Sequence, residues 1–236
     1  MLVTDFDGTL AEIGPDPARS VALPESLDAL RRLSRSLKQV VVLSSRTPTE
    51  LSLLVPLSGV RLIGDSGLAP PTAEEQRALE RFNTEAARLL GAVAGAWIEI
   101  KPASTTVHLR NAQISSEEAM ALLRPLIKDT GLYGSQGRKV IEVHTHFAGK
   151  GTALTALMGE VEPGGVVLMG DDENDRAAFE VVSRSDIPHM CVGISSPEVA
   201  PDLFDRCDVV LGSPQQASDF LQILAHWAAS PPPAGA

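Results

Sequence analysis

Residues 1–10 read MLVTDFDGTL, and this stretch holds the pattern that decides the fold. A short apolar run, Met1–Val3, leads directly into two carboxylates, Asp5 and Asp7, where a strand is expected to run into a turn. Side chains two residues apart lie on the same side of an extended chain, so these like charges need a cation or a shared proton. Gly8 permits the bend by which the backbone turns away from the two carboxylates. A magnesium site with a nucleophilic carboxylate fits this pattern, and an acidic turn after a strand is the alternative.

Composition narrows the class of protein. The chain has 236 residues, of which 44% are hydrophobic, as in a globular protein of one large domain or two small ones. The formal net charge of −10 argues against nucleic acid as a partner, because no large basic patch is evident. No apolar run approaches the roughly 18–20 residues of a membrane span, and no signal peptide is recognisable, so a cytoplasmic protein without a membrane partner is expected. Cys191 and Cys207 match neither a disulfide framework nor a zinc spacing and are expected to be buried small hydrophobes.

Strand-like and helix-like segments alternate along the chain, which indicates an α/β fold. Apolar runs predict strands over residues 1–4, 39–43, 60–63, 165–169, 190–192 and 209–211, and helical spacing predicts helices over 24–37, 49–55, 149–158, 177–182 and 213–228. Between them, after Pro70-Pro71, the pattern predicts helices over 72–90 and 115–128 and strands over 97–100, 105–109 and 139–143. The interpretation is a core domain of residues 1–66 and 142–236 with an inserted α+β cap of residues 67–141. The tail from Ser230 is expected to be disordered.

Three further segments place polar groups just past predicted strands or at a helix start. Ser44 follows the strand at 39–43, Lys150 lies between two glycines where a helix begins, and residues 170–175 read GDDEND after a buried strand. A serine, a lysine at a helix N-terminus and a carboxylate cluster can bind a phosphate and its metal ion. Taken singly, each segment has a simpler explanation: Ser44 as a turn residue, Lys150 as a solvated surface lysine, and residues 170–175 as a solvated acidic loop.

The order of these segments resembles the four motifs of the haloacid dehalogenase superfamily of phosphatases, over nearly the full chain. The segments are a strand followed by DFDGT, a strand followed by Ser44, Gly-Lys-Gly around Lys150, and a strand followed by GDDEND. The resemblance implies a Rossmann-like parallel-sheet core with an inserted cap. It implies that Asp5 is the nucleophile that attacks phosphorus. Asp7 would be the general acid for the leaving alcohol and then the base that activates water. Ser44 and Lys150 would bind the transferring phosphoryl oxygens, since phosphoryl transfer is mostly positioning and neutralisation of charge.

The same resemblance implies a magnesium cofactor. Its ligands would be the Asp5 carboxylate, the Asp7 carbonyl and Asp171. The side chains implied to support these ligands are Asp172, Asn174 and Asp175.

Two segments of the insert are similar to trehalose-6-phosphate phosphatases. Residues 101–110 read KPASTTVHLR, like the Lys-Pro…His-x-Arg strand of those enzymes, and residues 137–142 read GRKVIE, like their Gly-x-Lys-x-x-Glu segment. The resemblance implies that Lys139 and Glu142 contact sugar hydroxyls. The other residues assigned to the substrate are Arg46, Gly67 and Arg110. For Glu142 and Arg110 an ion pair across neighbouring strands is the alternative.

The chain departs from that family at three positions. Ser66 stands where the family usually has a histidine, Ser45 replaces the glycine of Ser-Gly-Arg, and Asn174 replaces a threonine. The expected activity is magnesium-dependent hydrolysis of trehalose 6-phosphate by a monomer whose partner is a small phosphorylated sugar. The alternatives are a phosphatase of a glycosyl-3-phosphoglycerate or another sugar phosphate, and a non-catalytic sugar-phosphate-binding module. The intact Asp5 and Asp7 pair argues against the last of these.

Overall fold

The structure is a computed structural model that describes residues 1–14, 16–137, 139–145 and 149–230. The predicted disordered tail lies outside these residues, apart from Ser230. By their contacts the residues divide into two compact units, which are described separately: Met1–Gly67 with Lys150–Ala236, and Leu68–Gly149. The predicted boundary at residues 141 and 142 falls inside a strand of the second unit.

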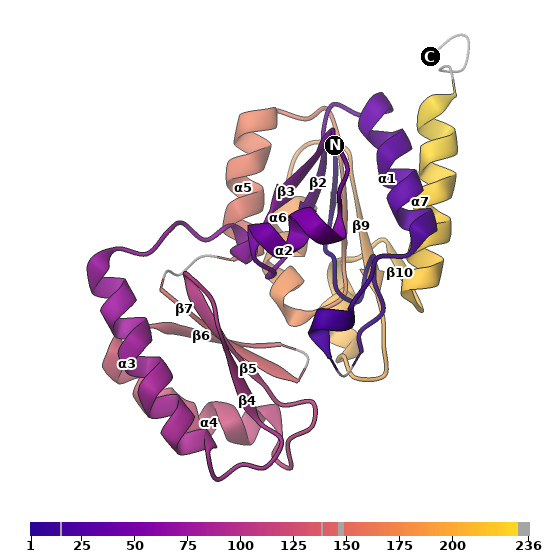
Figure 1. The fold of residues 1–236 in the computed structure, drawn as a ribbon. Helices are drawn as coiled ribbons and strands as arrows, with labels where there is room; N and C mark the ends of the chain where they lie inside the picture. The colour runs from indigo at the N-terminus through magenta and orange to yellow at the C-terminus, as the bar shows by residue number, and fades with distance from the viewer. Residues whose placement is uncertain (15, 138, 146–148, 231–236) are drawn as a thin grey trace. The chain divides into compact units, whose positions relative to one another are not determined.

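The described residues of the first unit form a six-stranded parallel sheet (Figure 1). Its strands are β1 (Leu2–Thr4), β2 (Val40–Leu43), β3 (Val60–Ile63), β8 (Val166–Gly170), β9 (His189–Ile194) and β10 (Val209–Leu211). Their order across the sheet is β10-β9-β8-β1-β2-β3, so β1 lies between β8 and β2. Strands from the two ends of the chain therefore share one sheet.

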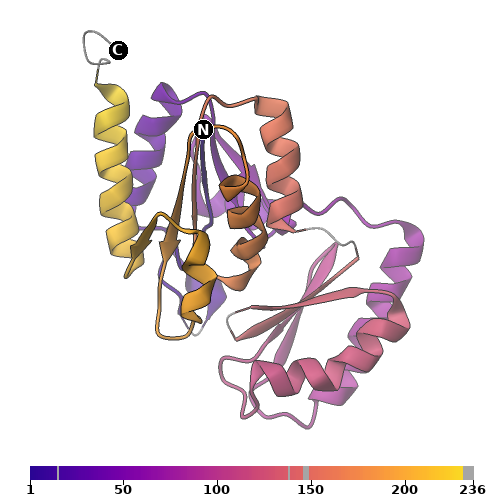
Figure 2. The same cartoon turned by 180° about the vertical axis from the view of Figure 1, so that it is seen from behind.

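Helices cover both faces of this sheet (Figure 2). The helices are α1 (Pro24–Ser36), α2 (Pro48–Leu54), α5 (Lys150–Val161), α6 (Arg176–Ser183) and α7 (Pro214–Ala229), and short 3-10 turns cover Pro17–Arg19, Asp65–Gly67, Glu173–Asp175 and Pro201–Arg206. The helices α1 and α7 lie side by side on one face, and α5 and α6 pack on the other.

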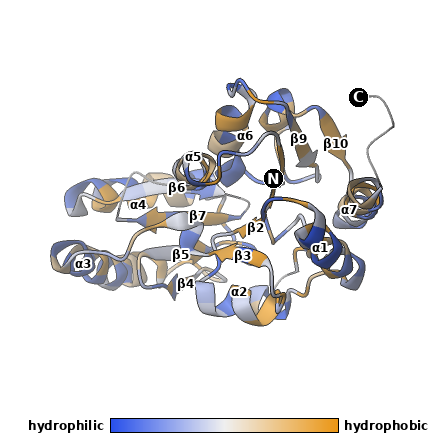
Figure 3. Ribbon diagram, turned by 90° about the horizontal axis from the view of Figure 1, so that it is seen from above, coloured by the Kyte–Doolittle hydropathy of each residue, from blue (hydrophilic) through white to orange (hydrophobic). Residues whose placement is uncertain are grey.

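The central strands bury side chains on both faces. Leu2 and Val42 pack in the cluster that includes residues of α1 and α7, whereas Val3, Val41 and Leu168 pack in the cluster that includes residues of α5 and α6. A strand buried on both faces needs apolar residues at consecutive positions, which explains its continuous apolar runs. In Figure 3, β3 and β9 are coloured as hydrophobic, while α1 shows hydrophilic residues as well.

The second unit is an antiparallel sheet of four described strands covered by two helices. Its strands are β4 (Trp97–Ile100), β5 (Ser104–His108), β6 (Tyr133–Gly137) and β7 (Val140–His144), in the order β4-β5-β7-β6, and its helices are α3 (Ala73–Leu90) and α4 (Ser116–Thr130). Ile141 and Val143 of β7 pack with the apolar residues of both helices. Glu142 alternates with them and therefore belongs to the other face of the sheet.

The predicted fold class is confirmed, since a parallel α/β core accompanies an inserted α+β unit. Thr72 caps the N-terminus of α3, and Glu75 completes the capping box. The strand β6 was not predicted, because its sequence YGSQG carries two glycines and no alternating apolar pattern. Among the described residues, none of the helices combines the length and apolar character needed to cross a membrane.

Candidate active site

Three adjacent strands bring the predicted residues to one edge of the first unit. Thr4, the last residue of β1, is in register with Met169 of β8 and Val42 of β2. Asp5, Asp171 and Ser44 follow within one or two residues of these partners. Because the three strands are parallel, their carboxyl ends and the residues after them lie at the same edge, where ligands bind in open α/β sheets.

Asp5, Asp171 and Asp175 form a buried acidic cluster. Their carboxylate oxygens lie within 4.8 Å of one another, and each residue is at most 6% exposed. Lys150, at the start of α5, lies among them: its Nζ is 2.7 Å from Asp5 Oδ1 and 2.8 Å from Asp175 Oδ1. The lysine therefore offsets part of the charge of the cluster.

Burial and charge act in opposite directions on these groups. Burial raises the pKa of Asp5 to about 7; Lys150 opposes this shift, and the carboxylates of Asp175 and Asp7 add to it. For Lys150, burial acts to lower the pKa, but Asp175 and Asp5 outweigh burial and raise it above its usual value. The lysine is therefore a permanent cation, and the acidic cluster favours a further positive charge beside Asp5.

The donor set fits a hard divalent cation. Buried carboxylate oxygens that converge within a few ångströms are the ligands that Mg²⁺ prefers. Gly8 allows this arrangement, because its φ is +77° and an added Cβ would lie 2.0 Å from Asp171 Oδ2. The Asp7 carboxylate is not part of the cluster. The contribution of the Asp7 carbonyl stays a prediction.

Asp175 is held by the backbone around it. Its Oδ2 accepts hydrogen bonds from the amides of Asp171 and Asp172 at 3.1 and 3.2 Å, while its Oδ1 accepts one from Lys150. The Asp172 side chain accepts a hydrogen bond from the Glu173 amide, and Asn174 is half-buried in the same 3-10 turn. Asp175 therefore links the loop after β8 to Lys150. Its role in supporting a metal ion stays a prediction.

Asp7 has a different set of partners. Arg46 donates from Nε to Asp7 Oδ2 and from Nη2 to Asp7 Oδ1, both at 2.7 Å. Ser20 donates from Oγ to Asp7 Oδ1 at 3.0 Å. The structure thus places Arg46, which the resemblance assigned to the substrate, on the carboxylate assigned to proton transfer. Sequence reasoning missed Ser20, which lies in a loop with no motif around it.

The loop after β2 is braced by the loop after β3. Ser44 is 1% exposed, its Oγ accepts a hydrogen bond from the Arg46 amide, and its carbonyl accepts one from the Ser66 amide at 2.8 Å. Ser66 has φ +54°, which is uncommon for a residue other than glycine. Gly67 has φ +77°, and an added Cβ would lie 2.4 Å from the Ala153 Cβ. The position where the family usually has a histidine is therefore a buried turn in left-handed conformation.

The predicted sugar-binding residues lie in the second unit. Glu142 is half-buried on β7, in register with Thr106 of β5. Lys139 is exposed between β6 and β7, with φ +56°, and its carbonyl accepts a hydrogen bond from the Leu109 amide at 2.8 Å. Arg110 is half-buried just after β5.

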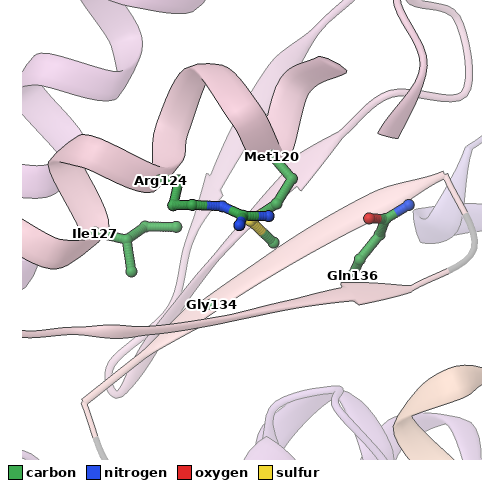
Figure 4. Close-up of a pocket in the computed structure, with 5 residues that line it drawn as sticks. All are labelled: Met120, Arg124, Ile127, Gly134 and Gln136. Atoms are coloured by element: carbon green, nitrogen blue, oxygen red, sulfur yellow. The ribbon is translucent and has the colours of Figure 1, made fainter. Parts of the chain in front are cut away.

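A cavity of about 330 Å³ lies in the second unit between α4 and β6 (Figure 4). It is lined by Met120, Arg124, Ile127, Gly134 and Gln136. Arg124 is the charged side chain among them. This lining offers no carboxylate, thiol or imidazole, so it lacks the nucleophiles and metal ligands found in the first unit.

The cysteines carry no reactive character. Cys191 is buried as predicted and Cys207 is half-buried, and both are free thiols. Burial raises the pKa of each thiol to about 12, so both stay protonated at neutral pH. A thiol nucleophile is therefore not supported at either position.

Comparison with known proteins extends these observations. Residues 3–202 match the model of the trehalose-phosphatase family. The trehalose-phosphate phosphatase of Mycobacterium tuberculosis is 28% identical over 240 residues, which cover 94% of this chain and 60% of that protein. An uncharacterized glycosyl hydrolase of the same organism is 32% identical over 198 residues, 75% of this chain and 15% of that protein.

A solved structure shares the fold. The C-terminal domain of the Candida albicans trehalose-6-phosphate phosphatase superposes with a TM-score of 0.79 at 20% identity, covering 95% of this chain and 91% of that domain. The chain spans only 15% to 60% of the length of the two curated relatives.

Proposed function

The chain belongs to the trehalose-phosphatase family, and from this premise we propose that it is a magnesium-dependent phosphatase of a phosphorylated sugar. The proposed substrate is trehalose 6-phosphate, and the products are trehalose and phosphate. The observation that carries the proposal is the position of Asp5, a buried carboxylate paired with Lys150 inside a cluster of three acids. A carboxylate nucleophile and a fixed cation beside it are what transfer of a phosphoryl group to an aspartate needs.

The proposed reaction has two halves. A carboxylate oxygen of Asp5 attacks phosphorus, the bond from phosphorus to the sugar oxygen breaks, and Asp7 gives its proton to that oxygen. Asp7, now a carboxylate, then takes a proton from a water molecule whose oxygen attacks the aspartyl-phosphate. The bond from phosphorus to Asp5 breaks, and phosphate leaves.

Other residues of the first unit orient and neutralise the phosphoryl group. The Lys150 ammonium and the Ser44 hydroxyl would bind its oxygens. Asp5 and Asp171 would hold magnesium, together with the Asp7 carbonyl, and Asp175 would keep this loop in place. When bound, magnesium supplies positive charge that offsets repulsion between Asp5 and an anionic substrate.

Recognition of the sugar is proposed for Lys139 and Glu142 of the second unit. Lys139 adopts a left-handed backbone conformation, which costs energy for a residue with a side chain and is often retained for function. Glu142 is on the sheet face opposite the helices, so it is not needed for the apolar packing of that unit. A carboxylate and an ammonium can bind the hydroxyl groups of a sugar by hydrogen bonds.

The test is phosphate release from trehalose 6-phosphate, glucose 6-phosphate, a glucosyl-3-phosphoglycerate and p-nitrophenyl phosphate, each with Mg²⁺ and with EDTA. We expect turnover that requires Mg²⁺ and is fastest with trehalose 6-phosphate. Faster turnover of another sugar phosphate would support the proposed phosphatase reaction but identify that compound, and not trehalose 6-phosphate, as the substrate. Binding of the sugar phosphates without release of phosphate would identify a binding module and refute the proposal.

The variant Asp5→Asn tests the nucleophile. Its rate should fall by more than about a thousandfold, because the amide cannot form the covalent intermediate. Asp28→Asn, an exposed carboxylate on α1, is the matched control and should retain wild-type turnover. A residual Asp5→Asn rate within about tenfold of wild type would correspond to a loss of only about 1.4 kcal/mol and would contradict the assignment.

A further inference from the structure

We propose that Arg46 and Ser20 are positioning residues that hold the Asp7 carboxylate for its proton transfers, an inference that rests on the proposed phosphatase function. Three donors converge on this carboxylate: Arg46 Nε and Nη2, both at 2.7 Å, and Ser20 Oγ at 3.0 Å. The sequence alone suggested a substrate contact for Arg46. The geometry points to a role that acts through Asp7.

The arginine fixes both the position and the plane of the carboxylate. A fork of two parallel N–H···O bonds defines an orientation that a single contact or a point charge does not. Ser20 adds a third donor to the Asp7 carboxylate, and it comes from a loop 13 residues beyond Asp7 in the sequence. The Asp7 side chain is 32% exposed, so burial alone does not fix its orientation.

Arg46 is itself held rigidly. It is 7% exposed, its Nη2 also donates to the Pro17 carbonyl at 2.8 Å, and its guanidinium lies 5.3 Å from the centroid of the Phe6 ring. Its carbonyl accepts a hydrogen bond from the Asp65 amide at 2.8 Å. The position of the guanidinium is therefore fixed by these contacts, and its two hydrogen bonds fix the position of the Asp7 carboxylate in turn.

Arg46 cannot take over the chemistry of Asp7. A guanidinium has donors and no acceptor, and it stays protonated in proteins. If it only positions Asp7, its loss should impair the two steps that use Asp7 as acid and base. Attack of Asp5 on a substrate whose leaving group needs no proton should be spared.

The first experiment compares leaving groups in the full chain with Mg²⁺. For Arg46→Gln and Arg46→Lys, kcat/KM for the best sugar phosphate should fall by about 100-fold, within the usual contribution of general acid catalysis. With p-nitrophenyl phosphate, whose phenolate leaves unprotonated, kcat/KM should fall by less than about tenfold. Lysine keeps the charge without the fork and should not rescue the loss. Ser20→Ala should show a smaller loss with the same dependence on the leaving group.

The second experiment follows p-nitrophenol release before the steady state. In the Arg46 variants, hydrolysis of the aspartyl-phosphate should be slow because Asp7 no longer activates water. A burst of about one equivalent of p-nitrophenol per enzyme should precede a slow steady rate. A merely structural defect would lower the amplitude and the rate together without producing this burst.

Two matched controls complete the design. Arg61→Gln removes another ion-paired arginine of the same unit, whose partner is Glu160 on the surface. Ser26→Ala removes a buried hydroxyl that has no hydrogen-bond partner in the described structure. Both should leave the ratio of sugar phosphate to aryl phosphate activity at its wild-type value.

Other outcomes overturn the proposal in distinguishable ways. Equal losses with both substrates in the Arg46 variants, without a burst, would show that Arg46 binds the phosphoryl group or only maintains the fold. Wild-type protein that hydrolyses neither substrate would refute the proposed function, and this inference with it.

Discussion

Replacement of Lys150 by methionine is the most informative test of the acidic cluster. The lysine is 4% exposed, and its Nζ lies 2.7 Å from Asp5 and 2.8 Å from Asp175. Methionine retains much of the length and apolar contact of the side chain but removes the ammonium. The change therefore isolates the effect of charge more cleanly than a substitution by alanine would.

The expected loss of stability follows from the spacing of the carboxylates. At the 4.8 Å that bounds the cluster, two unit charges repel by about 3.5 kcal/mol at an effective dielectric constant of about 20. Removing one partner of a buried ion pair typically costs about 3–5 kcal/mol. We expect Lys150→Met to lower the free energy of unfolding by this amount at about pH 8, which is above the pKa of about 7 that Asp5 has in the wild-type protein.

The assay is urea unfolding followed by circular dichroism, in EDTA and again in Mg²⁺. Lys38→Met is the matched control: Lys38 is an exposed lysine of the same unit that donates to the Glu162 carbonyl, and its loss should change the free energy of unfolding by less than about 0.5 kcal/mol. Mg²⁺ should recover part of the loss in Lys150→Met, because a ligand that binds only the folded state stabilises it.

The double variant Lys150→Met/Asp5→Asn separates charge from packing. If repulsion among buried carboxylates causes the loss, neutralising Asp5 should restore stability to Lys150→Met. A double variant less stable than Lys150→Met, or a Lys150→Met protein as stable as the Lys38→Met control, would refute the electrostatic account.

Three further predictions concern other parts of the proposed site. Glu142→Ala should raise KM for the sugar phosphate about tenfold and spare p-nitrophenyl phosphate, while Glu117→Ala on α4 changes neither; equal losses with both substrates would make Glu142 structural. Gly8→Ala should lower the free energy of unfolding by at least about 1 kcal/mol and weaken Mg²⁺ binding in calorimetry, because φ is +77° and a Cβ would meet Asp171; unchanged Mg²⁺ affinity would contradict the site. In EDTA, burial raises the pKa of Asp5 from 3.8 to about 7, so the folded chain keeps a proton that the unfolded chain loses. The free energy of unfolding should therefore fall by up to about 4 kcal/mol between about pH 4 and pH 7, and Asp5→Asn should abolish this fall in urea titrations.

Local patterns predicted the core sheet and the residues at its edge. Strands such as β1 and β2 are buried on both faces, so their apolar runs are visible in the sequence without knowledge of their neighbours. The positions of Asp5 and Asp171 follow from the strands that precede them. The edge strand β6 could not be predicted in this way, because its residues become a strand through pairing with β7.

The partners of Asp7 depend on contacts between distant residues. Arg46 lies 39 residues beyond Asp7, and its motif is equally compatible with a bound phosphate. Ser20 has no sequence signal at all. The left-handed conformation of Asp65 and Ser66 was also hidden, because residues with side chains rarely adopt it and no glycine marks these positions. Tertiary contacts, not local propensity, decide each of these features.

The separation of partners resolves the repulsion implied by the two carboxylates at the start of the chain. Asp5 pairs with Lys150 from α5, whereas Asp7 pairs with Arg46 from the loop after β2. Among the influences on the pKa of Asp5, the charge of Asp7 is the smallest. Each acid thus has its own cation, and the cations come from different elements. The proposed division of labour, with Asp5 as nucleophile and Asp7 as acid and base, is consistent with these separate partners, because a proton shared between the two carboxylates would couple the two roles.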